Sequence, residues 1–76
     1  MTLTEVVAGV LEVDPAEVTD DSGPQTIGTW TSLRHLQLVV TLEEVYGLSF
    51  AFEDIRDVRS VADLRAVLRA KGTAAT

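Results

Sequence analysis

Few residues in this 76-residue sequence could do chemistry, and the best candidates gather near position 32. Ser32 and His35 are three residues apart, a spacing that places a hydroxyl and an imidazole on one face of a helix. A serine nucleophile also needs an acid that orients its base, and no acid stands within helical reach of His35. We therefore interpret His35 as a part-buried helix residue and predict no catalytic residue in this chain.

Other common kinds of site are absent from the sequence. There is no cysteine, which excludes disulfides and thiolate sites, and one histidine is too few for a zinc cluster. Gly23 and Gly28 lack the lysine and the spacing of a phosphate-binding loop. The short acidic pairs do not follow a calcium-loop pattern. We predict no metal site.

Ser32 is notable for its place in the chain. Residues 19–31 show no periodicity and are rich in turn formers, whereas residues 32–46 predict a helix that Gly47 ends. At a helix N-terminus, free backbone N–H groups and the positive end of the dipole would stabilise a phosphate ester on a serine. On spacing alone, Ser32 or Thr31 could instead simply cap the helix. Both interpretations stay open at this point.

The helix over 32–46 is apolar on two sides. One stripe is expected to face the core and contains Leu38, Val39, Leu42, Val45 and Tyr46. The second stripe is rotated away from it and contains Leu33, Leu36 and Val40. A domain of this size can hardly surround such a helix, so the second stripe is expected to be a partner surface. The alternative is that these three residues pack under the long loop.

The elements that precede this helix are predicted as follows. Apolar residues at helical spacing from Leu3 to Leu11 predict a first helix that begins with a Thr2–Glu5 capping box. We expect Asp14-Pro15 to end it and to start one short turn. After this turn, Val18 is expected to fold back onto the core, and Ile27 and Trp30 are expected to hold the long loop over 19–31 against it.

The elements after Gly47 are shorter. Leu48, Phe50 and Phe52 alternate with small residues, which predicts an extended connector that places two aromatic rings in the core. A short helical piece is expected over 53–58. Ser60 with Asp63 predicts the start of a last helix that runs to Lys71. Residues 73–76 are expected to form a frayed tail.

Composition narrows the function classes. Twelve acids against six bases give a net charge of −6, which argues against binding to nucleic acid or to anionic membranes. A basic protein partner would complement this charge, although the charge could also serve only solubility. The sequence shows no signal peptide and no apolar run that could span a bilayer. We expect one cytoplasmic domain over residues 1–76.

Two segments resemble a known family, the acyl carrier proteins. They are Gly28–Val39, with the Ser-Leu pair at 32–33, and Leu42–Phe50, with its Leu-Glu-Glu-x-Tyr-Gly pattern. Together they are similar to the second-helix region of that family, and segments 54–55 and 60–64 are similar to its third and fourth helices. The resemblance implies an all-α, four-helix carrier-protein bundle with three main helices, one short helix and a long first loop.

The resemblance also implies a function. A phosphopantetheinyl transferase would attach 4'-phosphopantetheine covalently to Ser32, and acyl groups would ride as thioesters on the thiol of that arm. The docking face implied for the transferase and for acyl-loading and acyl-processing enzymes (ketosynthase, acyltransferase or ligase type) consists of Leu33, Leu36, Val40, Glu43 and Glu44. The chain would be a monomeric carrier and not an enzyme.

One position departs from the family pattern. Thr31 stands where the family has an aspartate before the serine; threonine can cap the helix but supplies no charge. This departure favours dedicated partners, and the surrounding pattern is similar to stand-alone carriers of polyketide or mixed polyketide–peptide biosynthesis. Two alternatives remain open, namely a peptidyl carrier protein and an unmodified carrier-like interaction domain.

Overall fold

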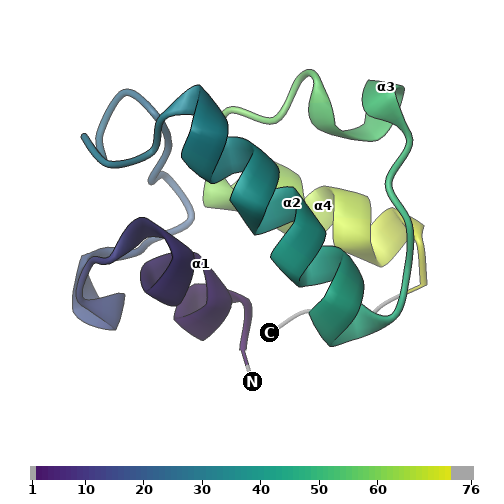
Figure 1. The fold of residues 1–76 in the computed structure, drawn as a ribbon, viewed down its shortest axis with the longest axis horizontal. Coiled ribbons are helices and arrows are strands. Elements are labelled where there is room, and N and C mark those ends of the chain that lie inside the picture. The colour runs from purple at the N-terminus through teal and green to yellow at the C-terminus, as the bar shows by residue number, and fades with distance from the viewer. Residues whose placement is uncertain (1, 73–76) are drawn as a thin grey trace.

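The computed structural model describes residues 2–72, and this part of the chain is helical without any strand. The elements are α1 (Leu3–Leu11), the 3-10 turn η1 (Pro15–Glu17), α2 (Ser32–Tyr46), α3 (Phe52–Ile55) and α4 (Val61–Ala70). In Figure 1, α2 runs diagonally across the middle of the molecule, with α1 to its lower left and α3 to its upper right. The predicted all-α fold of three main helices and one short helix is confirmed.

The core lies between the three main helices. Its largest fully buried side chains come from α1, α2 and α4 alone, and they are Leu3, Val7, Leu11, Leu38, Leu42, Val61, Leu64 and Leu68. Each set repeats at the three- and four-residue spacing of one helix face, so each helix contributes a single apolar stripe. None of the four residues of α3 is buried, which leaves that helix at the surface.

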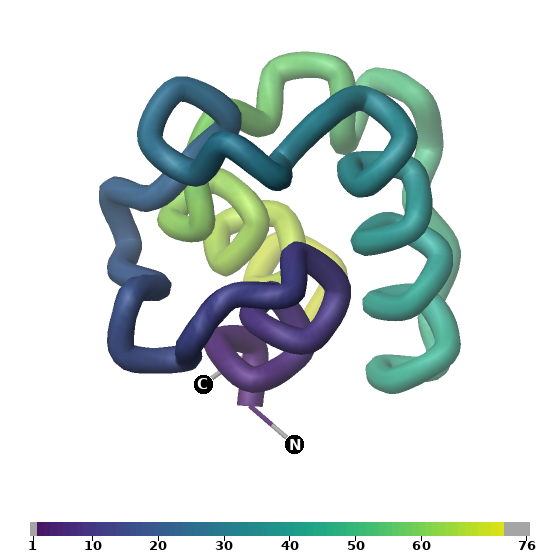
Figure 2. Tube along the Cα trace, turned by 60° about the vertical axis from the view of Figure 1, so that its left-hand side comes forward, coloured from purple at the N-terminus to yellow at the C-terminus, as the bar shows by residue number. Residues whose placement is uncertain are grey.

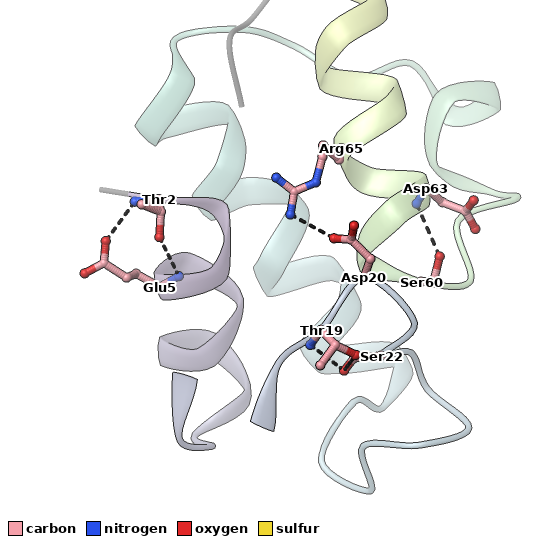
Figure 3. Close-up of polar contacts among 8 residues, drawn as sticks. All are labelled: Thr2, Glu5, Thr19, Asp20, Ser22, Ser60, Asp63 and Arg65. Atoms are coloured by element: carbon pink, nitrogen blue, oxygen red, sulfur yellow. Dashed lines mark hydrogen bonds and ion pairs between the residues drawn. The ribbon is translucent and has the colours of Figure 1, made fainter. Parts of the chain in front are cut away.

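The capping signals of the sequence are confirmed. The Thr2 hydroxyl accepts from the backbone N–H of Glu5, and the Glu5 carboxylate accepts from the N–H of Thr2 (Figure 3). The hydrogen bond from the Thr2 N–H lowers the pKa of Glu5, because it stabilises the charged carboxylate. At the start of α4, the Ser60 hydroxyl accepts from the N–H of Asp63 at 3.2 Å.

The end of α1 was predicted wrongly. The helix ends at Leu11 and not at Asp14-Pro15, because Glu12 adopts the left-handed conformation with φ of 58°. The N–H of Val13 then turns back to the Ala8 carbonyl, as in a Schellman-type ending. Asp14-Pro15 starts only the short turn η1, as expected.

The long connection from α1 to α2 is fixed to α4. Val61 and Ala62, at the start of α4, donate their N–H groups to the carbonyls of Ser22 and Asp20. Arg65 adds an ion pair to the Asp20 carboxylate at 2.9 Å (Figure 3). Because the first N–H groups of a helix have no acceptor within the helix, these loop carbonyls complete the N-terminus of α4. Figure 2 shows the connection running along the left-hand edge and over the top of the molecule towards α2.

The second half of this connection reaches into the core. Ile27 and Trp30 are buried, as is Val18 nearer to α1, so the three predicted contacts are confirmed. Trp30 is only 3% exposed and lies directly before the start of α2. The buried indole therefore anchors the end of the connection to the core, one residue before the N-cap Thr31.

Several expectations for the second half of the chain were wrong. The short helix expected over 53–58 is α3 at Phe52–Ile55, so it starts one residue earlier and ends three residues earlier. Val45 is 41% exposed, because successive residues are about 100° apart around a helix and the core takes the neighbouring Tyr46. Phe52 is 73% exposed. Because α3 begins at this residue, the alternation that directs Phe50 towards the core does not continue to Phe52. The last helix ends at Ala70, one residue before the predicted Lys71. The predicted tail over 73–76 lies outside the described residues.

Candidate functional site

Ser32 is the first residue of α2 and is exposed to solvent. Thr31 is the N-cap, and its hydroxyl accepts from the N–H of Arg34 at 3.3 Å. The question of which residue caps the helix is thereby answered in favour of Thr31. Within residues 2–72 the Ser32 hydroxyl makes no hydrogen bond, so its oxygen is available for esterification.

The backbone around Ser32 suits a phosphate. The first helical hydrogen bond runs from the N–H of His35 to the Thr31 carbonyl, and the N–H of Arg34 is taken by the cap. The N–H groups of Ser32 and Leu33 come before these two and have no acceptor within the helix. They stand at the positive end of a 15-residue helix dipole, which favours an anion bound there.

A hollow of about 450 Å³ opens beside Ser32. It lies between the start of α2, the long connection and α3, and its wall is mostly apolar: Pro24, Trp30, Thr31, Ser32, His35, Leu36, Phe52, Ile55, Arg56 and Val58. Arg56 is the one charged member of this wall. A pendant chain attached to Ser32 would therefore have both free space and apolar surface next to its point of attachment.

His35 lies in the wall of this hollow and is half-buried, as the sequence predicted. Its Nδ1 accepts a hydrogen bond from the indole Nε1–H of Trp30 at 3.1 Å. The two rings are stacked, with centroids 6.2 Å apart and planes inclined by 23°. Within the described residues, no carboxylate hydrogen-bonds to the imidazole, so the Ser–His–acid arrangement of a hydrolase is not formed.

The second stripe of α2 is exposed. Leu33, Leu36 and Val40 are 65%, 58% and 52% exposed, so the alternative that they pack under the long loop is wrong. A second hollow of about 470 Å³ lies on the other side of Leu36, where Val10 of α1 approaches α2. Leu36 thus forms a ridge between two hollows, and an exposed apolar surface of this kind is typical of a partner surface.

The charged residues of α2 lie in different settings. Arg34 turns towards α1, where its guanidinium donates to the Val10 carbonyl at 2.7 Å and pairs with Glu12 at 2.8 Å. Its positive charge is therefore matched by an acid. The Glu43 carboxylate is half-buried and accepts from the N–H of Phe50 at 2.9 Å, which ties the connector to the end of α2. Glu44 is exposed.

Sequence reasoning did not predict that residues of α3 and its end line this site. Phe52 and Arg56 are four residues apart, both line the hollow beside Ser32, and both are exposed. Helical spacing over 52–56 would have placed them on one face, but the alternation from Leu48 to Phe52 predicted a buried Phe52 instead. Among the described residues, no group of three histidine or carboxylate side chains is arranged to hold a metal ion.

Comparison with known proteins decides the family. The family model described as phosphopantetheine attachment site matches residues 2–68. The chain belongs to this phosphopantetheine attachment family. It is also similar to polyketide-8 synthase acyl carrier protein 2 of Streptomyces avermitilis, with 36% identity over 69 residues that cover 91% of this chain and 79% of that protein.

Family membership accounts for the geometry of the site. A member of the phosphopantetheine attachment family holds acyl groups as thioesters on a covalent 4'-phosphopantetheine, and the exposed hydroxyl, free N–H groups and hollow at the start of α2 fit such a group. The cofactor supplies the thiol that this cysteine-free chain lacks. No helix within residues 2–72 is long and apolar enough to cross a membrane.

Proposed function

We propose that this chain is an acyl carrier protein whose phosphopantetheine arm is attached to Ser32. The observation that carries the proposal is the position of the Ser32 hydroxyl. It is exposed, makes no hydrogen bond within residues 2–72, and stands at the start of α2 beside the hollow. Thr31, the neighbouring hydroxyl, is already engaged as the cap of the helix.

The attachment reaction needs a phosphopantetheinyl transferase and coenzyme A. The Ser32 oxygen forms a new bond to the phosphorus that carries the pantetheine, while the pyrophosphate bond of coenzyme A breaks and the nucleotide leaves. The chain itself contributes no catalytic group and is not an enzyme. Its contribution is to hold the arm on a rigid helix end, so that a tethered acyl group reaches an effective concentration on the order of millimolar at a docked enzyme.

We assign docking to the exposed stripe of α2 and to the side chains around it. Leu33, Leu36 and Val40 supply apolar area, and Glu44 supplies negative charge for a basic partner. Glu43 contributes at the edge of this face, with one carboxylate oxygen already bound to the Phe50 N–H. Phe52 extends the face across the hollow to α3. Such a small interface suits contacts that must be brief.

The similarity to a polyketide synthase carrier supports a place in polyketide biosynthesis. The enzymes that would dock are then the transferase and acyl-loading and acyl-processing enzymes of the ketosynthase, acyltransferase or ligase type. We place this work in the cytoplasm, with the carrier acting as a monomer over residues 1–76. Because Thr31 leaves the start of α2 without an acid in its first turn, we expect a transferase that does not depend on that charge.

Intact-mass measurement after incubation with coenzyme A and a broad-specificity transferase tests the attachment site. We expect the mass of one phosphopantetheinyl group to be added to the wild-type chain and to be absent from Ser32→Ala. Thr31→Asp is the matched control, because aspartate keeps the cap and supplies the charge that the family usually has. It should be modified at least as fast as the wild type. If several transferases all leave the wild-type mass unchanged, the chain is an unmodified interaction domain.

Substitutions on α2 test the docking face. Leu36→Ala and Val40→Ala should change the free energy of unfolding by no more than about 0.5 kcal/mol, because both side chains are already exposed. Both should slow acyl loading by a ligase or acyltransferase. Leu38→Ala is the control on the same helix and should cost about 2–5 kcal/mol, because Leu38 is fully buried. Parallel loading with acyl and aminoacyl substrates separates an acyl carrier from a peptidyl carrier.

A further inference from the structure

His35 is the polar side chain closest in sequence to Ser32 that faces the hollow without a role in the proposed function. Its contact with Trp30 engages only one of its two ring nitrogens. The second nitrogen, Nε2, makes no hydrogen bond within residues 2–72 and is open to the solvent of the hollow.

The hydrogen bond from Trp30 sets the tautomer of the neutral His35 ring. The indole Nε1–H can only donate, so Nδ1 of His35 must be the unprotonated acceptor. In a neutral imidazole the remaining proton then resides on Nε2, which becomes a donor. Within residues 2–72 no group accepts a hydrogen bond from Nε2, although Trp30 holds the ring in one orientation.

The direction of the side chain places the imidazole over the first turn of α2. Helical side chains lean towards the N-terminus, over the turn that precedes them. The contact with Trp30, five residues earlier, shows that the imidazole leans in this way. Ser32 precedes His35 by three residues on the same face of α2, and both line the same hollow. A group esterified to the Ser32 oxygen would therefore share the hollow with the imidazole of His35.

We infer that His35 is a binding residue for the arm: its Nε2–H donates a hydrogen bond to the phosphodiester attached at Ser32, and Trp30 is the positioning residue that sets the tautomer. This inference rests on the proposed function. A hydrogen bond to an anionic oxygen is shorter and stronger than one between neutral groups. Together with the free N–H groups of Ser32 and Leu33, it holds the first atoms of the arm at the mouth of the hollow.

Two isosteric variants separate this role from a structural one. Asn at position 35 keeps a polar atom near the place of Nδ1, so His35→Asn retains an acceptor for Trp30 and loses the donor at Nε2. Gln places its amide nitrogen near Nε2, so His35→Gln retains the donor and loses the acceptor. The test uses phosphopantetheinylated protein, with complete modification of each variant confirmed by intact mass and folding confirmed by circular dichroism.

The readouts are the ³¹P resonance of the phosphodiester and the ¹⁵N resonances of the His35 ring. We expect attachment of the arm to shift the wild-type Nε2 signal. His35→Asn should shift the ³¹P resonance, whereas His35→Gln should restore it close to the wild-type position. The Trp30 indole N–H signal reports the contact with Nδ1. It should shift in His35→Gln, which loses this acceptor, and stay close to the wild-type position in His35→Asn, which retains it.

The outcomes distinguish the two proposals. If the modified wild type, His35→Asn and His35→Gln share one ³¹P position and attachment leaves the Nε2 signal unchanged, this inference is wrong while Ser32 remains the attachment site. If no transferase adds the arm, both proposals fall. A neutral Nδ1–H tautomer in the unmodified protein would also overturn the inference, because Nε2 would then have no proton to donate.

Discussion

The two connections that flank α2 hold the aromatic residues that line the hollow beside Ser32 in opposite ways. The longer one, residues 12–31, buries Trp30 to 3% exposure and is bonded to α4 through Ser22 and Asp20. The shorter one, residues 47–60, contains α3, yet it leaves Phe52 73% exposed. The length of a connection and the presence of a helix in it therefore do not determine how firmly it is held to the rest of the fold. The burial of its side chains and its backbone hydrogen bonds to other elements determine this.

This difference matters because both connections form the wall of the hollow beside Ser32. Trp30 on one side belongs to the core, whereas Phe52 on the other side belongs to a four-residue helix without a buried residue, and Arg56 directly follows that helix. We expect the side formed by the long connection to fix the position of the attachment site. The α3 helix itself is expected to adjust its distance from α2 at lower cost, because none of its four residues is buried.

Trp30→Ala should give the largest effect. The substitution removes a nearly fully buried aromatic side chain, and such changes cost about 3–5 kcal/mol of the free energy of unfolding. In a chain of this size that loss is most of the expected stability. Urea unfolding followed by circular dichroism measures it. A loss below about 1 kcal/mol would show that the long connection is not part of the core.

Gly23→Ala should give the next largest effect. A Cβ atom at this position would overlap the carbonyl oxygen of Arg59, so the connection would have to separate from the start of α4. We expect a loss of about 1–3 kcal/mol, as for overpacking in a tightly packed site. Gly28→Ala is the matched control in the same connection, because nothing lies within 4 Å of the added atom. Equal melting temperatures for the two variants would contradict the close approach.

The carboxylate of Asp54 holds α3 to the rest of the molecule. It is paired with Lys71 at 2.9 Å and accepts from the N–H of Ala51 at 2.7 Å. The hydrogen bond from Lys71 and then that from Ala51 lower the pKa of Asp54, because both favour the charged form. Since the folded pKa lies below the unfolded one, this carboxylate stabilises the fold at neutral pH, and its contribution disappears as the pH falls through the folded pKa.

Asp54→Asn should therefore lower the melting temperature slightly at pH 7. The difference in melting temperature between this variant and the wild type should disappear as the pH falls below the ordinary aspartate pKa of about 3.9. Melting curves across this range measure the change. Glu53→Gln removes the neighbouring carboxylate, which makes no ion pair within the described residues, and should show a weaker dependence. A difference that persists unchanged at low pH would mean that Asp54 does not act through its charge.

The sequence predicted the elements that are governed by local signals. The Thr2–Glu5 and Ser60–Asp63 caps, the bounds of α2 and the stop at Gly47 all follow from side chains within a few positions of one another. The site at Ser32 followed from one such boundary together with the family resemblance. What could not be predicted depends on distant backbone, such as the approach of Gly23 to Arg59 and the contact of Arg34 with Val10. Phe52 was misplaced because a strand-like alternation and the first turn of α3 overlap at one residue.

Phe52→Ala should give the smallest change in stability and a clear change in docking. A side chain that is 73% exposed loses little on truncation, so the free energy of unfolding should stay within about 0.5 kcal/mol of the wild type. An exposed aromatic residue at the edge of an apolar surface is a typical anchor for a partner, so acyl loading by a docked ligase or acyltransferase should slow. Phe50→Ala, two residues earlier, is the matched control, because Phe50 packs against the core and should lose stability instead. If Phe52→Ala loads at the wild-type rate, the docking face ends on α2, and α3 serves only as a wall of the hollow.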